Sequence, residues 1–231
     1  MTDVMRRVKR SGFEAARSSG KKVDIIVNGE TSRADRNVVR AVTDPLMHIV
    51  RNAVDHGIEP PKERGNKDEK GKVEIDISTS SSGLEIVIKD DGRGIDTSKI
   101  LEKAITNGLV DREKSKQLKD EEIFDFIFEP GFSSAEIVTE LSGRGVGMDV
   151  VKTSINQMQG SIKIESIVSA GTKVTLRLPL TLAVVGILLV AENGYEFAFP
   201  ILNVEEIINL SLIHISEPTR PLYISYAVFC L

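Results

Sequence analysis

The feature that most constrains this chain is a pair of neighbouring segments in which apolar and polar residues alternate. Every second residue is apolar over 73–77 and again over 84–88, and Gly83 lies between the two segments. A period of two is typical of half-buried strands, and the short glycine-marked gap predicts that the strands pair as a hairpin. Hairpins pair antiparallel, so the pattern disfavours a doubly wound, wholly parallel sheet.

The remaining periodicities predict helices and strands in irregular alternation. We expect helices over residues 1–18, 34–56 and 148–158, and strands over 22–27, 162–164 and 174–178. Pro45 should interrupt or bend the second helix. Residues 92–147, rich in glycine and charge, predict one short helix and a long mobile cover. Together these elements predict an α+β fold, a two-layer α/β sandwich.

Composition argues against several classes of function. The 231-residue chain has a net charge of −4, whereas nucleic-acid binding usually shows as a basic excess. Its single cysteine, Cys230, rules out a disulfide framework or a cysteine metal site within one chain. The longest apolar run, 182–190, is too short to span a membrane, and the charged N-terminus lacks a signal-peptide apolar region. We therefore expect a cytoplasmic protein without membrane insertion or nucleic-acid binding.

One face of the second predicted helix carries unusual polar residues. On a helical wheel, four side chains lie within about 80° of His48, namely Arg51, Asn52, Asp55 and His56. Taken alone, this helix is explained by a solvated face with an Arg51–Asp55 ion pair as well as by a functional site. An asparagine oxygen suits Mg²⁺, and a histidine one turn earlier could accept or position a proton.

Two glycine-rich motifs follow this helix. Asp90 stands at the end of a predicted strand and is followed by Gly92 and Gly94, which let a ligand approach the backbone closely. An ionised carboxylate only accepts hydrogen bonds, so it suits the amino group of adenine and repels the carbonyl of guanine. A simple Asp-Gly turn is the favoured explanation of this motif taken alone.

The second motif, Gly143-Arg144-Gly145-Val146-Gly147, directly precedes a predicted helix. Its glycines can turn backbone N–H groups toward phosphates, and the helix start adds a favourable dipole. The chain contains no P-loop of the form G-x-x-x-x-G-K-[ST], and the spacing differs from the dinucleotide-binding fingerprint. The two motifs therefore suggest nucleotide binding of another type.

Three segments resemble one known family closely. Residues 44–59 resemble the asparagine box of the chemotaxis histidine kinases, residues 128–134 their phenylalanine box, and residues 141–151 their second glycine box. These kinases belong to the ATP-binding superfamily that also contains type II topoisomerases, heat-shock chaperones and mismatch-repair ATPases. The resemblance covers about residues 1–209 and implies the Bergerat-type ATP-binding fold.

Position by position, the resemblance implies binding of ATP and Mg²⁺. Asn52 would bind Mg²⁺, Asp90 would bind adenine, and His48 would be the general base. The residues around the phosphates would be Arg51, Asp55 and His56. The pocket and its lid would be shaped by Gly92, Gly94, Phe128, Phe132, Gly143, Gly145 and Gly147, and Thr172 would support the adenine carboxylate.

The same resemblance implies four segments. Residues 1–18 would be the end of a dimerisation helix, and residues 19–180 the ATP-binding catalytic domain. Residues 181–210 would begin a truncated CheW-like regulatory domain, an all-β SH3-like barrel fragment. Residues 211–231 contain no glycine and resemble translated sequencing-adapter sequence, so we expect a non-native tail.

The implied activity is transfer of the ATP γ-phosphoryl group to a histidine on a separate phosphotransfer domain. The implied partners are that domain, a CheW-type coupling protein, chemoreceptors and a downstream response regulator, with the intact kinase a homodimer. One alternative is an ATP hydrolase of the same superfamily, in which a glutamate replaces His48 to activate water. A second is a non-catalytic scaffold that couples receptors.

Overall fold

The computed structural model describes residues 1–30, 34–81, 83–132, 147–180, 187–192, 195–201 and 204. The chain divides into two compact units, Met1–Ala183 and Val184–Leu231. The first unit contains the predicted sandwich and the candidate site.

A five-stranded mixed sheet forms one layer of the first unit. Its strands are β1 (Val23–Asn28), β2 (Gly71–Ser80), β3 (Gly83–Asp90), β4 (Ser161–Ile167) and β5 (Gly171–Leu178), in the spatial order β1-β2-β3-β5-β4. The β1–β2 pair is parallel and the other three pairs are antiparallel. The predicted hairpin is therefore confirmed, with Ser80 opposite Gly83 at its turn.

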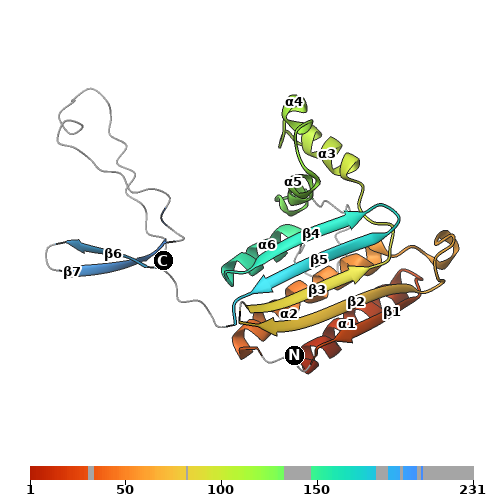
Figure 1. The fold of residues 1–231 in the computed structure, drawn as a ribbon, viewed down its shortest axis with the longest axis horizontal. Coiled ribbons are helices and arrows are strands. Elements are labelled where there is room, and N and C mark those ends of the chain that lie inside the picture. The colour runs from red at the N-terminus through yellow and green to blue at the C-terminus, as the bar shows by residue number, and fades with distance from the viewer. Residues whose placement is uncertain are drawn as a thin grey trace. The chain divides into compact units, whose positions relative to one another are not determined.

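Three helices form the second layer, all on one face of the sheet (Figure 1): α1 (Thr2–Ser18), α2 (Arg36–Asn52) and α6 (Met148–Gln157). The apolar face of each strand points toward them, and Ile75, Ile86 and Leu176 have no exposed surface. Burying one such side chain stabilises the fold by about 1.5–3 kcal/mol. The alternating pattern in the sequence thus marks the side of the sheet that forms the core.

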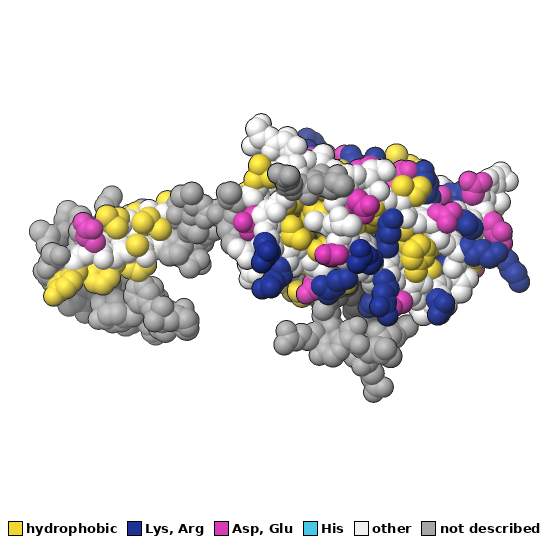
Figure 2. Space-filling view, turned by 90° about the horizontal axis from the view of Figure 1, so that it is seen from below, with side chains coloured by type: hydrophobic (Ala, Val, Ile, Leu, Met, Phe, Trp, Pro, Cys, Tyr) yellow, Lys and Arg dark blue, Asp and Glu magenta, His cyan; other side chains and the backbone are white. Residues whose placement is uncertain are grey.

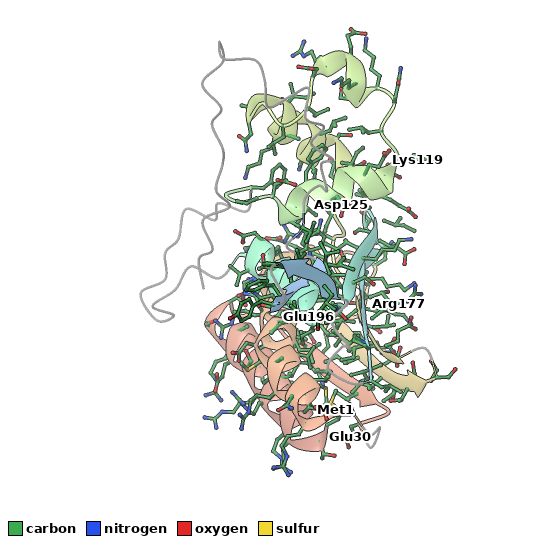
Figure 3. The ribbon with its side chains drawn as sticks, turned by 90° about the vertical axis from the view of Figure 1, so that its left-hand side faces the viewer. Met1, Glu30, Lys119, Asp125, Arg177 and Glu196 are labelled. Atoms are coloured by element: carbon green, nitrogen blue, oxygen red, sulfur yellow. The ribbon has the colours of Figure 1, made fainter. Side chains whose placement is uncertain are left out.

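The opposite face of the sheet carries charged side chains. Arg177 of β5 lies on this face (Figure 3), where its Nε donates to the Glu85 carboxylate at 2.8 Å. The space-filling view in Figure 2 shows basic, acidic and apolar side chains interspersed over one side of the first unit. Neighbouring charges of opposite sign on adjacent strands stabilise this surface modestly.

The helix that carries the polar face ends differently from the sequence prediction. Asp35 caps α2 by accepting a hydrogen bond from the Asn37 N–H at 2.8 Å, and Pro45 lies within the helix. Residues Ala53–Gly57 then form one turn of π-helix, in which the Ile58 N–H donates to the Ala53 carbonyl at 2.8 Å. A π-turn shifts the residues that follow it around the helix axis, and such turns are frequent at functional sites.

The segment between the two glycine motifs holds more helix than predicted. Where the sequence suggested one short helix, the structure has α3 (Thr97–Thr106), α4 (Arg112–Ser115), α5 (Asp120–Asp125) and the 3₁₀ turn η3 (Phe126–Phe128). Asp96 caps α3 by accepting from the Ser98 N–H, and these helices lie beyond β4 in Figure 1. The expected cover also includes residues 133–146, which lie outside the described residues.

The second unit contributes a two-stranded antiparallel sheet, β6 (Ile187–Glu192) and β7 (Tyr195–Pro200). The prediction of a truncated barrel extends to residues 205–210, and the expected non-native tail covers 211–231; both ranges lie outside the described residues. Within the described residues, no helix has the length and apolarity to cross a membrane.

Candidate nucleotide-binding site

A cavity of about 210 Å³ opens between the end of α2 and strands β3 and β5. Its apolar walls come from eight side chains, Ile49, Ala53, Ile88, Ile95, Ile127, Met148, Ile164 and Val174. Its polar lining includes Asn52, His56, Asp90 and Thr172, each of which the sequence singled out. Apolar walls with a few converging polar groups are typical of small-molecule sites.

Asp90 presents a largely buried carboxylate at the cavity wall. The pKa of this carboxyl is raised to about 6, chiefly by burial and also by the negative charges of Asp91 and Glu59. Hydrogen bonds from the Gly92 and Thr172 N–H groups act in the opposite direction, the first at 3.0 Å. Asp90 is therefore mostly ionised above pH 7, and it is held in place by two backbone donors.

Close backbone contacts explain two glycines beside Asp90. A Cβ added to Gly92 would lie 2.2 Å from the Gly57 carbonyl oxygen. A Cβ added to Gly94, whose φ is +67°, would lie 2.1 Å from the Ile167 carbonyl oxygen. Such separations are impossible for real atoms, so side chains here would displace the cavity wall. Both glycines are required by geometry, whatever ligand binds.

Asn52 faces the cavity from the last turn of α2. Its amide nitrogen donates to the Met148 sulfur at 3.3 Å, which links α2 to the start of α6. The amide oxygen is the atom that a hard cation would use. The structure thus joins Asn52 and Asp90 in one cavity, although they lie on different elements and 38 positions apart.

The other predicted phosphate-side residues lie on α2 or on the π-turn that follows it, and one of them lines the cavity. His48 is half-buried, and burial together with the nearby positive charges of Arg51 and His56 lowers its pKa, while Asp149 opposes the shift. His48, Arg51 and Asp55 are outside the cavity lining, whereas His56 is part of it. A neutral His48 imidazole at pH 7 can accept a proton.

The two predicted phenylalanines lie in the core rather than at the cavity. Phe128 and Phe132 are each 5% exposed. The Lys152 ammonium lies 5.0 Å from the centroid of the Phe128 ring, and the Lys103 ammonium lies 5.1 Å from that of Phe132. Cation–π contacts of this kind fix both rings. The side chain of this segment that does line the cavity is Ile127.

Of the second glycine motif, only Gly147 belongs to the described residues. It is the N-cap of α6, which carries Met148 and Asp149 beside the site. Gly143 and Gly145 lie outside the described residues, so their predicted contact with phosphates stays a prediction.

Sequence reasoning missed Ser166 of β4. Its hydroxyl accepts from the Ile95 N–H at 2.8 Å, lies 2.9 Å from the Thr172 hydroxyl and donates to the Gly171 carbonyl. Ser166 therefore ties the loop after Gly94 to the β4–β5 hairpin. The sequence offered a weak signal, since Ser166 stands opposite Thr172 across a predicted hairpin.

Comparison with known proteins identifies the fold. Residues 41–182 match the family of histidine kinase-, DNA gyrase B- and HSP90-like ATPases. This match and the mixed sheet with helices on one face confirm the predicted α+β sandwich. A histidine kinase domain from the blue-light activated kinase of Erythrobacter litoralis is 15% identical, with a TM-score of 0.46 over 77% of this chain and 65% of that one.

Two relatives extend the similarity over most of the chain. The sensor histidine kinase CheAY of Helicobacter pylori is 42% identical over 90% of this chain and 26% of its own length. The chemotaxis protein CheA of Halobacterium salinarum is 39% identical over 90% of this chain and 31% of its own. The chain thus spans about a quarter to a third of these relatives. It belongs to the histidine kinase-, DNA gyrase B- and HSP90-like ATPase family, as an ATP-binding domain of the kind found in CheA chemotaxis proteins.

Proposed function

We propose that this chain is the catalytic core of a chemotaxis-type histidine kinase. It binds Mg²⁺-ATP and transfers the γ-phosphoryl group to a histidine on a separate phosphotransfer domain. The observation that carries this proposal is the shared cavity, with the ionised Asp90 on one wall and Asn52 of the polar helix on another. The CheA names of relatives that cover 90% of the chain support the same reaction.

The cavity fits adenine better than guanine. Aliphatic side chains such as Ile88 and Val174 provide apolar surfaces for a purine ring. The Asp90 carboxylate, fixed by the Gly92 and Thr172 N–H groups, can only accept a hydrogen bond at neutral pH. It therefore favours the adenine amino group and repels the guanine carbonyl oxygen. A site built around a buried polar group discriminates strongly against analogues that leave it unpaired.

Asn52 is the residue that we assign to Mg²⁺. The described residues contain no group of three or more histidine, cysteine, aspartate or glutamate side chains placed to hold a metal ion. Mg²⁺ commonly keeps several waters and takes few protein ligands beside phosphate oxygens. One neutral amide oxygen beside a phosphate-binding region fits that coordination preference. When bound, the ion would offset the charge on the phosphates.

His48 is the residue that we assign to proton transfer. Its pKa is lowered by burial and by the charge of Arg51, so the imidazole is neutral at pH 7 and can accept a proton from the acceptor histidine. Arg51 supplies positive charge on the same helix. Phosphoryl transfer depends mainly on positioning and charge stabilisation, which these groups can provide.

The remaining assignments follow from the relatives. We propose that α1 continues a dimerisation helix, that β6 and β7 begin a CheW-like domain, and that the intact kinase is a cytoplasmic homodimer. Its partners would be a CheW-type coupling protein, chemoreceptors and a response regulator. In this chain α1 packs against α2 and β1 within the first unit, and Met5 and Val8 are completely buried.

The direct test combines the chain with γ-³²P-ATP, Mg²⁺ and a separately made phosphotransfer domain. The expected result is acid-labile, base-stable label on the histidine of that domain. Release of inorganic phosphate without label on the domain would instead indicate an ATP hydrolase. Binding of ATP with neither outcome would favour a non-catalytic scaffold.

A further inference from the structure

A buried ionic network lies behind the adenine side of the site. It is centred on the loop between the π-turn and β2, which contains the 3₁₀ turn η2 (Pro61–Glu63). The Arg64 side chain, 1% exposed, donates to the Glu59 carboxylate at 2.9 Å and to the Asp91 carboxylate at 2.7 Å. Its Nε also donates to the Asp68 carbonyl. Because a guanidinium keeps its charge, its burial requires these acceptors.

Lys67 completes the network with all three of its donors. Its ammonium donates to the Glu59 carboxylate at 3.1 Å, to the Asp91 carbonyl at 2.8 Å and to the Gly92 carbonyl at 2.7 Å. Two of these bonds hold the backbone of the residues that directly follow Asp90. An ammonium has no further donors, so Lys67 is fully committed to this turn and to Glu59.

The same turn packs against the end of the helix that carries Asn52. The Arg93 N–H donates to the Gly57 carbonyl at 2.9 Å, and Gly57 is the last residue of the π-turn. The close approach of Gly92 to that carbonyl leaves no space for a side chain. The position of residues 91–93 therefore sets how the strand of Asp90 and the polar helix lie relative to each other.

We propose that Lys67, supported by Arg64, is a positioning residue for adenine recognition. It fixes the turn whose Gly92 N–H holds the Asp90 carboxylate, so that this carboxylate is oriented before the nucleotide arrives. The inference rests on the proposed function, in which Asp90 reads adenine. Residues that orient the ligands of a metal ion contribute about 10- to 100-fold to its affinity, and we expect an effect of the same order here.

The test uses the full chain and titration calorimetry with ATP and with GTP. In Lys67→Gln the ATP affinity should fall at least about tenfold, and the preference for ATP over GTP should shrink. Loss of folded protein would weaken the binding of ATP and GTP equally. The ratio of the two affinities therefore separates a positioning role from simple destabilisation. The matched control is Lys70→Gln, because Lys70 is exposed in the same loop and forms an ion pair with Asp24, at 3.4 Å, away from the turn that follows Asp90.

Lys67→Arg keeps the charge and provides a second variant should Lys67→Gln not fold. A planar guanidinium cannot reproduce the three convergent hydrogen bonds of the ammonium. The ratio of ATP affinity to GTP affinity in this variant should therefore also shrink. Wild-type affinity and selectivity in either folded Lys67 variant would overturn the proposal. A wild-type chain that does not prefer ATP over GTP would instead overturn the proposed function. The titration of the wild type shows this before any variant is made.

Discussion

Replacing Asp90 with asparagine should make the nucleotide-free protein more stable while it removes ATP binding. Burial raises the pKa of Asp90 to about 6 from its ordinary 3.8. This difference corresponds to about 3 kcal/mol at 1.36 kcal/mol per pKa unit. Because the folded-state pKa is raised, the stabilising contribution of this group is complete below pH 3.8 and is lost as the pH rises through about 6.

At pH 7.5, therefore, the ionised Asp90 carboxylate destabilises the fold by up to about 3 kcal/mol. In Asp90→Asn the amide oxygen can still accept from the Gly92 N–H group, and no charge is buried. We expect its melting temperature to rise by up to about 10 °C, at 2–4 °C per kcal/mol for a chain of this size. The advantage over wild type should shrink by about 1.4 kcal/mol between pH 7.5 and pH 5.

ATP affinity should change in the opposite direction, falling by as much as about 10⁴-fold. The measurements are thermal melts at several pH values and titration calorimetry with ATP. Asp76→Asn is the matched control, because the pKa of Asp76 is lowered, chiefly by the Asn28 side chain. That variant should gain no stability at pH 7.5 and should bind ATP normally. An Asp90→Asn protein that is less stable than wild type at pH 7.5, or that binds ATP as tightly, would refute the reasoning.

Three further predictions concern the polar helix, the lid and the tail. Asn52→Ala should abolish the Mg²⁺-dependent part of ATP binding. His48→Ala should slow phosphoryl transfer by about 10²–10⁴-fold with little loss of ATP affinity. Unchanged transfer in His48→Ala would show that His48 is not the general base. Residues 107–147 should gain protection from hydrogen exchange when ATP binds, and equal protection with and without ATP would contradict this. Deleting residues 211–231 should leave ATP affinity unchanged and improve solubility, whereas weaker binding would show that the tail is native to the domain.

The sheet and its core were predictable because strand alternation is a local property. Val73, Ile75 and Ile86 are buried because every second residue of a strand points to the same face. The pairing of Asn52 with Asp90 was predictable only through the family resemblance, since nothing in the spacing alone places them in one cavity.

The π-turn is contacted by a residue far away in the sequence, and no local pattern indicated this turn. The Lys21 ammonium donates to the Val54 and Asp55 carbonyls at 2.9 and 2.5 Å, which satisfies acceptors at the end of the helix. Desolvation in this position lowers the Lys21 pKa. A lysine more than thirty positions earlier thus helps to support the local helix geometry, and only the folded structure brings the two together.

The phenylalanine segment shows a different limit of sequence reasoning. Phe128 and Phe132 were predicted to shape the nucleotide pocket and its lid, and that assignment stays a prediction. In the structure both rings are buried and lie beneath the lysines of α6 and α3. Whether a motif residue lines the cavity or supports the residue that does, here Ile127, depends on packing between helices.

A crystal structure of the chain with Mg²⁺ and a non-hydrolysable ATP analogue tests the central claim most directly. We expect the adenine amino group within hydrogen-bonding distance of the Asp90 carboxylate. We also expect the metal on the Asn52 amide oxygen, with the phosphates beside the α2 helix end. An adenine bound elsewhere, or a metal held without Asn52, would contradict it.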